Sequence, residues 1–294
     1  MMKRHLIFFS ILTATAACTT VVDFDIPVER PKVVINSLFS PDSVWQIQIS
    51  RAKHVLDNRQ GSYFDPVTDA SVSIRDQDNV LIETITGSFK NLVGHSYIGK
   101  TKPLPGKLYV IQVEVNNETS IKAINKVPTL VPITSFNIDS SRFIAEGEAI
   151  EIEINFKDPA EEKNFYTIKI IEDAFYVINK DTVWFPREIY YVLEDPTLNS
   201  EFSEPDKYIN DNLFNGKNNS LHLKIYFYGS NFTSLNLRLA LVSISEEYYK
   251  YFTTKSLQDN TNGDPFAQPV QVFSNIENGL GIFAGYSSSV VELK

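Results

Sequence analysis

The sequence predicts a mainly β protein made of two β-sandwich-like domains that follow a signal peptide, and three observations support this prediction. Apolar and polar residues alternate in many short segments, which is typical of half-buried strands. The chain has 20 phenylalanines and 14 tyrosines but only 2 methionines, and this composition favours aromatic-rich strands over helices. The beginning of the chain, in contrast, has the pattern of an export signal.

The predicted export signal occupies residues 1–17. Two basic residues precede an apolar stretch of about a dozen residues, which is too short to span a bilayer as a helix. Cys18 follows directly and is the only cysteine of the chain. Its position resembles the lipobox of bacterial lipoproteins, although Thr15 stands where most lipoboxes have leucine. The resemblance implies cleavage before Cys18 and acylation of this residue, and an ordinary secretory signal with a free cysteine is the alternative.

A chain that begins at Cys18 would be anchored in a membrane through its N-terminal lipid. Two or three acyl chains provide a stable anchor, because each buried methylene contributes about 0.8 kcal/mol. Cleavage also removes two positive charges, so the formal net charge changes from −9 to −11. This acidic balance argues against nucleic acid as a partner. A single cysteine allows no disulfide within the chain, so packed cores must stabilise the fold.

Residues 32–128 are predicted to form the first domain, an immunoglobulin-like or transthyretin-like sandwich, after a tether at residues 18–31. Residues 45–50 alternate strictly, and burial in the core explains Trp45 at their start better than a binding role does. The other predicted strands of this domain are residues 33–38, 70–75, 80–85, 97–99, 108–115 and 120–125. Two prolines and the loss of alternation at residues 128–132 predict a joint between domains.

Residues 133–294 are predicted to form a second, β-rich domain with one short helix. Strands are predicted at residues 149–156, 165–171, 221–228 and 235–242, and the first two are expected to pair as a hairpin. Residues 245–257 are predicted to be helical, because Ser245 can cap the N-terminus and aromatic residues share one face.

Residues 185–216 show no clean alternation and are rich in Glu, Asp, Pro and Asn, so we expect a partner surface in or beside this segment. Interface cores favour aromatic residues and arginine. The candidate binding residues are Trp184, Phe185, Arg187, Tyr190 and Tyr191.

The sequence contains no recognisable catalytic or metal-binding motif. His54, His95 and His222 lack the spacing of metal ligands, and neither a nucleophile elbow nor a phosphate-binding loop occurs. A carboxylate pair of the glycosidase type stays open, because its members can lie far apart in sequence. Residues 206–212 offer carboxylates and amides for Ca²⁺ but lack the order of an EF-hand. We therefore expect no catalytic residue, no cofactor and no metal site.

Five segments carry a family resemblance, and the last of them is the most specific: residues 21–23, 34–41, 68–72, 156–159 and 264–283. Together they resemble the Bacteroidetes outer-membrane lipoproteins of the domain-of-unknown-function 4249 family. The resemblance implies a location in the outer membrane, at the cell surface or on the periplasmic face. It also implies an accessory role beside a TonB-dependent transporter, and it supplies no catalytic residues that could be assigned to this chain.

The leading expectation is therefore a non-enzymatic outer-membrane lipoprotein that binds a TonB-dependent barrel and assists nutrient capture. A stand-alone glycan- or peptide-binding surface lipoprotein is the first alternative, with Trp184 as its best stacking platform. A scaffold for envelope assembly and an enzyme of unrecognised type are the others.

Overall fold

The computed structural model describes residues 31–53, 65–91, 94–116, 118–139, 143–144, 147–178, 181–194, 207–227, 237–261, 266–268 and 270–293. Cys18, the predicted signal and nearly all of the predicted tether lie outside these residues. Strands dominate the described chain, which has one α-helix, so the predicted mainly β class is confirmed. Among the described residues, no helix has the length and apolar composition needed to cross a membrane.

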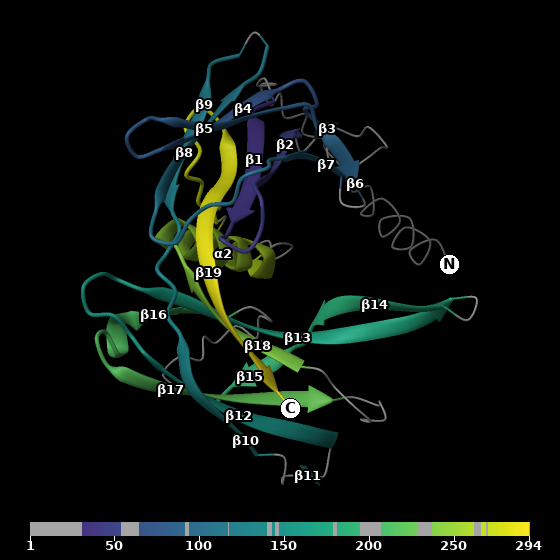
Figure 1. The fold of residues 1–294 in the computed structure, drawn as a ribbon, viewed down its shortest axis with the longest axis vertical. Helices are drawn as coiled ribbons and strands as arrows, with labels where there is room; N and C mark the ends of the chain where they lie inside the picture. The colour runs from purple at the N-terminus through teal and green to yellow at the C-terminus, as the bar shows by residue number, and fades with distance from the viewer. Residues whose placement is uncertain are drawn as a thin grey trace, which may run out of the picture. The chain divides into compact units, whose positions relative to one another are not determined.

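Two packed sheets form the first sandwich (Figure 1). One sheet contains, in spatial order, β5 (Leu81–Thr86), β4 (Ser71–Asp76), β8 (Leu108–Glu114) and β9 (Ile121–Lys126). The other is one part of a ten-stranded sheet and contains β1 (Val33–Phe39), β2 (Gln46–Arg51), β7 (Gly94–Ile98) and β6 (Phe89–Asn91), with β3 (Asp65–Pro66) beside β2. Alternate apolar residues of both sheets share one core. Trp45 is fully buried there, as predicted, and its Nε1 donates a hydrogen bond to Thr101 Oγ1 at 3.1 Å.

A five-stranded sheet and the remaining part of the ten-stranded sheet form the second sandwich. The first consists of β10 (Ile133–Asp139), β12 (Gly147–Lys157), β17 (Asn218–Phe227) and β15 (Tyr191–Leu193), with β11 (Phe143–Ile144) beside β12. The second consists of β14 (Asp181–Glu188), β13 (Phe165–Ile178), β18 (Leu237–Ile244) and β19 (Leu280–Leu293), with β16 (Tyr208–Asn210) beside β13. Apolar residues from both sheets fill the space between them.

The predicted hairpin of β12 and β13 is wrong. These strands lie in different sheets, because β12 pairs with β10 and β17 whereas β13 pairs with β14, β16 and β18. Ile154 of β12 and Ile168 of β13 are both fully buried in the core between the sheets. The chain between the two strands therefore crosses from one sheet to the other, which buries both apolar faces against each other.

Strand β19 pairs with strands from both sandwiches. Residues 280–285 run parallel to β1, and residues 286–293 run antiparallel to β18. Gly281 has a φ of +105°, and a Cβ at this position would overlap the carbonyl oxygen of Ile35. Figure 1 shows β19 as the long yellow strand that passes from one set of sheets to the other. The division of the chain at residues 128–132 stays a prediction, and β19 connects strands from both sides of it.

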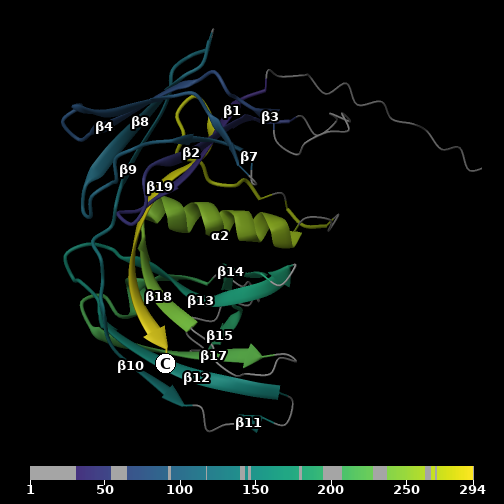
Figure 2. The ribbon, with the colours of Figure 1, turned by 45° about the vertical axis from the view of Figure 1, so that its right-hand side comes forward.

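Helix α2 (Glu246–Thr261) covers the face of β13, β18 and β19 that points away from the second sandwich core (Figure 2). The predicted cap is confirmed, because Ser245 Oγ accepts a hydrogen bond from the N–H of Tyr248 at 3.2 Å. Tyr248 is buried and packs in a cluster with Phe165, Val242 and Ile282. The helix ends four residues later than residue 257, where the sequence predicts its end.

Candidate functional site

Strands β13 and β14 form a two-stranded arm. Residues 165–172 of β13 pair with β18, whereas residues 171–178 pair with β14. Every residue of β14 is exposed. Solvent on both faces explains why the sequence pattern does not alternate here, since neither face needs to be apolar. Part of the segment predicted to be irregular is therefore a strand, and residues 195–206 of that segment lie outside the described residues.

The arm exposes three adjacent apolar side chains, Val183, Trp184 and Phe185, which we call the aromatic patch. Their exposed fractions are 38%, 61% and 39%. The register places Trp184 opposite Phe175 and Val183 opposite Tyr176. Because successive side chains of a strand point to opposite faces, the aromatic patch presents apolar surface on both sides of the arm.

Paired charges lie at the base of the arm, nearer to β18. Arg187 contacts the carboxylate of Glu172 through Nε at 2.9 Å and also through a terminal guanidinium nitrogen. Lys169 Nζ lies 3.3 Å from Glu188, and Arg238 contacts Asp173 at 2.6 Å. These pairs are partly exposed, so each one contributes little stability. Their positions leave the aromatic patch as the less polar part of the arm.

Tyr190 and Tyr191 differ, although they are neighbours in the sequence. Tyr190 is 45% exposed and directly precedes β15. Tyr191 is 2% exposed, and its hydroxyl donates a hydrogen bond to the carbonyl oxygen of Ile168 at 3.1 Å. Tyr191 is the first residue of β15 and pairs with Ile225 of β17. Because paired residues of neighbouring strands share a face of the sheet and Ile225 is buried, Tyr191 also points into the core. Tyr191 is therefore a core residue, and Trp184, Phe185, Arg187 and Tyr190 remain as exposed candidates.

A shallow hollow of about 180 Å³ lies on the outer face of the sheet that contains β12 and β17. Its lining residues are Asn137, Glu151, Ile152, Glu153, Glu194, His222 and Leu223. Lys224 Nζ lies 3.2 Å from Glu151 and 2.7 Å from Glu194, and Ser220 Oγ donates to Glu153 at 2.8 Å. The hydrogen bond to Glu194 raises the pKa of Lys224, so its ammonium stays charged and offsets the carboxylates. The hollow is the solvated face of an alternating sheet.

Metal-binding chemistry is not found in the described part of the chain, where no three His, Cys, Asp or Glu residues are grouped so that they could bind an ion. In the segment considered for Ca²⁺, Asp206 lies outside the described residues. Asn210 Oδ1 accepts a hydrogen bond from the N–H of Asn212 at 3.2 Å and caps the 3₁₀ helix η2 (Asp211–Leu213). His54 is not described, and His95 Nδ1 lies 3.2 Å from Ser88 Oγ.

Two aspartates of the described residues are buried, and of these only Asp211 lies in the segment considered for Ca²⁺. Asp158 is 1% exposed and Asp211 is 2% exposed. Asp158 Oδ1 accepts a hydrogen bond from the Tyr166 hydroxyl at 2.5 Å, and Oδ2 accepts one from the N–H of Gly216 at 2.8 Å. A sequence signal existed, because Asp158 continues the inward-facing parity of Ile152, Ile154 and Phe156.

The comparisons with known proteins identify a family. The family model described as "Domain of unknown function (DUF4249)" matches residues 19–291. No curated protein matches the chain. One solved structure, titled "Cytokine receptor complex - Crystal form 2", shares 7% sequence identity with a TM-score of 0.23, and the match covers 71% of this chain and 89% of that chain.

Proposed function

The chain belongs to the DUF4249 family, and from this premise we propose that it is a non-enzymatic lipoprotein of the bacterial outer membrane. Its role is to assist a TonB-dependent transporter in capturing nutrients. The observation that carries the proposal is the β13–β14 arm, which presents Trp184 and Phe185 to solvent on a regular hairpin.

The arm has the chemistry of a protein-binding element. Aromatic residues and arginine are enriched where interfaces are fully buried. A hairpin also restricts its backbone before binding, so less conformational entropy is lost when a partner covers it. Arg187 is paired with Glu172 at the base, and such a pair can fix the direction of the arm without joining the apolar contact.

The lipid anchor completes the proposal. Acylation of Cys18 places the chain on a membrane, and the barrel partner lies in the same membrane. The segment of residues 18–31 can span at most about 45 Å. The anchor therefore keeps the chain at the membrane and raises its effective concentration for a partner there.

The test is co-purification of a TonB-dependent barrel from mild detergent. We expect Trp184→Ala with Tyr190→Ala to weaken the complex by about 2 kcal/mol or more, a roughly thirtyfold loss of affinity. Phe89→Ala is the matched control, because Phe89 is a 64% exposed aromatic residue on another strand. Thermal denaturation of all variants should be unchanged. Barrel recovery at the wild-type level with the double variant would contradict the proposal.

A glycan- or peptide-binding lipoprotein that works alone is the second candidate. The 61% exposed Trp184 ring favours it, because aromatic faces stack on sugar rings and on peptide side chains. The same double variant discriminates between the two candidates. Loss of glycan or peptide binding by purified protein, without any barrel in the co-purified material, would favour the second candidate.

A further inference from the structure

Two loops of the second sandwich are joined by two buried carboxylates, one from each loop. The first loop, residues 158–164, connects β12 to β13, and the second loop, residues 211–217, connects β16 to β17. Asp158 of the first loop accepts a hydrogen bond from the N–H of Gly216 in the second, at 2.8 Å. Asp211 of the second loop accepts one from the N–H of Asn164 in the first, at 2.7 Å. Each carboxylate therefore binds the backbone of the opposite loop.

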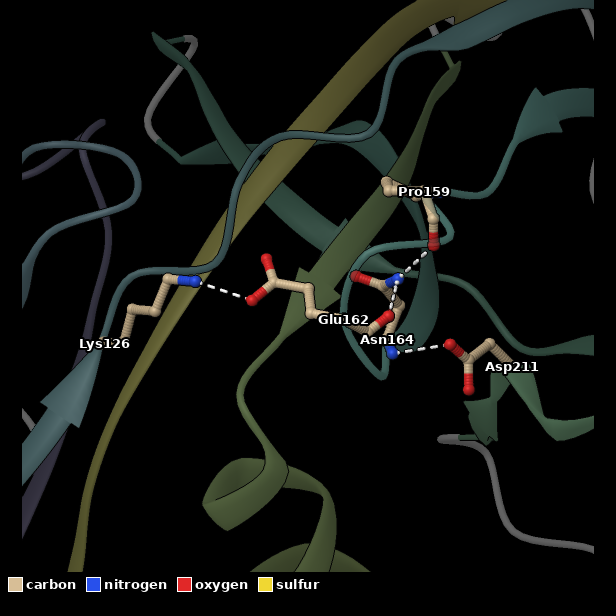
Figure 3. Close-up of polar contacts among 5 residues, drawn as sticks. All are labelled: Lys126, Pro159, Glu162, Asn164 and Asp211. Atoms are coloured by element: carbon tan, nitrogen blue, oxygen red, sulfur yellow. Dashed lines mark hydrogen bonds and ion pairs between the residues drawn. The ribbon is translucent and has the colours of Figure 1, made fainter. Parts of the chain in front are cut away.

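Backbone hydrogen bonds reinforce the same contact. The N–H of Asp158 donates to the carbonyl oxygen of Lys217 at 3.0 Å, and the N–H of Asp211 donates to that of Asn164 at 3.1 Å. The Asn164 side chain closes the first loop by donating to the carbonyl oxygens of Pro159 and Glu162 (Figure 3). The two loops are therefore joined by a small network that contains two buried acids.

The first loop also contacts the first sandwich. Glu162 Oε2 lies 2.7 Å from the ammonium of Lys126, the last residue of β9 (Figure 3). This ion pair is about half exposed and contributes little stability by itself. It nevertheless places the first loop next to the end of β9.

The buried surroundings of Asp158 disfavour its ionised form. Burial raises the pKa of this carboxyl, and hydrogen bonds from Tyr166 and Gly216 oppose the rise without cancelling it. The negative charge of Asp211 raises the pKa further. Burial keeps the hydroxyl of Tyr166 protonated, so it remains a donor.

The other charged groups nearby do not neutralise the two acids. Glu162 is negative and is paired with Lys126. Lys163 lies over the ring of Phe165, 5.1 Å from its centroid. The hydrogen bonds to Asp158 and Asp211 given above include none from a basic side chain, so ionising Asp158 inside this buried network is costly.

We propose that Asp158 acts as a proton-dependent latch between the two loops, which holds them together most firmly while its carboxyl is protonated and lets them open more readily once this carboxyl is ionised. Opening exposes Asp158 to water, where its pKa returns to the ordinary value of about 4. The closed state is thus fully stable below that value, and its stability falls as pH rises through the higher pKa of the closed state. Within this window the opening constant rises by at most tenfold per pH unit.

Hydrogen–deuterium exchange of the full-length protein in detergent tests the latch between pH 4 and pH 8, with rates corrected for intrinsic exchange. We expect the opening constants of peptides containing Asn164 and Gly216 to rise with pH, by at most tenfold per pH unit, and then to level off. Peptides from β8 serve as the internal reference. Constant protection of both loops across this range would overturn the proposal.

Asp158→Asn is the decisive variant. Its amide oxygen can accept from Gly216 and its amide nitrogen can donate to the Tyr166 oxygen, so the contacts persist without a charge. We expect exchange of both loops to become independent of pH. Asp181→Asn, at an exposed residue of β14, should behave like the wild type. A wild-type pH profile in Asp158→Asn would refute the latch.

Tyr166→Phe provides a second route if Asp158→Asn does not fold. Loss of the hydroxyl removes a hydrogen bond that favours the ionised carboxyl. The pH at which the opening constant levels off should therefore increase. An unchanged profile would also count against the proposal.

Discussion

The side-chain oxygen of Asn125 accepts a hydrogen bond from the backbone N–H of Gly285 at 2.8 Å, across 160 positions of the sequence. The amide nitrogen of the same side chain donates to the carboxylate of Glu247 at 2.6 Å. Asn125 lies in β9, Gly285 in β19 and Glu247 in the first turn of α2. One side chain, 4% exposed, therefore joins three elements that are distant in the sequence.

Replacing Asn125 with alanine should lower the free energy of unfolding by about 1–3 kcal/mol, because the buried N–H of Gly285 loses its acceptor. Urea denaturation measures this change. Asn116→Ala is the control, since Asn116 is exposed and its contact with Asp69 is 3.4 Å long. Its effect should stay within about 0.5 kcal/mol. Equal costs at both positions would show that the buried bond adds nothing.

Gly281→Ala should destabilise the protein strongly. Gly281 has a φ of +105°, and a Cβ would overlap the Ile35 carbonyl oxygen across the β1–β19 pair. Gly87→Ala is a matched control, because Gly87 has a φ of +80° but a Cβ added there would meet no atom within 4 Å. The control should cost only the left-handed backbone penalty of about 1–2 kcal/mol. Chemical denaturation should show a clearly larger loss for Gly281→Ala, and similar losses would argue against close contact of the two strands.

Glu83→Gln should destabilise the first sandwich at neutral pH. The Glu83 carboxylate accepts hydrogen bonds from the N–H groups of Lys100 and Thr101 and from the Thr101 hydroxyl, at 2.6, 3.0 and 2.6 Å. Burial alone would raise the pKa of Glu83, but these hydrogen bonds outweigh it and lower the pKa below its ordinary 4.5. The stabilisation is therefore present above pH 4.5 and is lost as pH falls through the lower pKa of the folded state.

Melting temperatures of the Glu83→Gln variant and the wild type should accordingly differ at pH 7 and converge toward pH 3. Glu277→Gln is the control, because Glu277 is exposed and its bonds to Lys122 are made by the backbone. A constant difference at every pH would mean that the charge of Glu83 has no part in the effect.

Cys18→Ala should abolish acylation and release the protein from the membrane or leave it unprocessed. The physical reason is that acyl chains supply the proposed anchor. Metabolic labelling with a fatty-acid probe, followed by membrane fractionation, measures both effects. A cysteine-free variant that incorporates the probe like the wild type would exclude Cys18 as the lipid site.

Strands with one apolar face could be predicted from the sequence. Residues 46–51 and 108–114 alternate, and the structure has strands there with buried alternate residues. The helix could also be predicted, because Ser245 and the aromatic face act locally. The β13–β14 arm could not be predicted from alternation, since both of its faces are exposed. The candidate binding residues Trp184 and Phe185 came from the sequence, but the strand that exposes them did not.

Pairing between strands that are distant in the sequence could not be predicted from sequence patterns. Alternation shows that β12 and β13 each have an apolar face, but not that these faces pack across two sheets. Residues 280–285 of β19, which include Gly281, pair with β1, and this partner strand is more than 240 positions away in the sequence. Tyr191 was misplaced for a related reason, because only its pairing with β17 determines which side of the strand faces the core.

The parallel pairing of β1 with β19 has a consequence for the order of events during folding. The ribosome adds Ile35 before its partner Gly281, and the 245 residues between them are synthesised in the meantime. Until then, β1 has an unpaired edge, and exposed strand edges promote aggregation. Contacts between such distant residues also slow folding. In a nascent chain of this protein, the first sandwich therefore cannot be completed until β19 has been synthesised. Premature termination before residue 280 should leave this sandwich without the strand that covers the edge of β1.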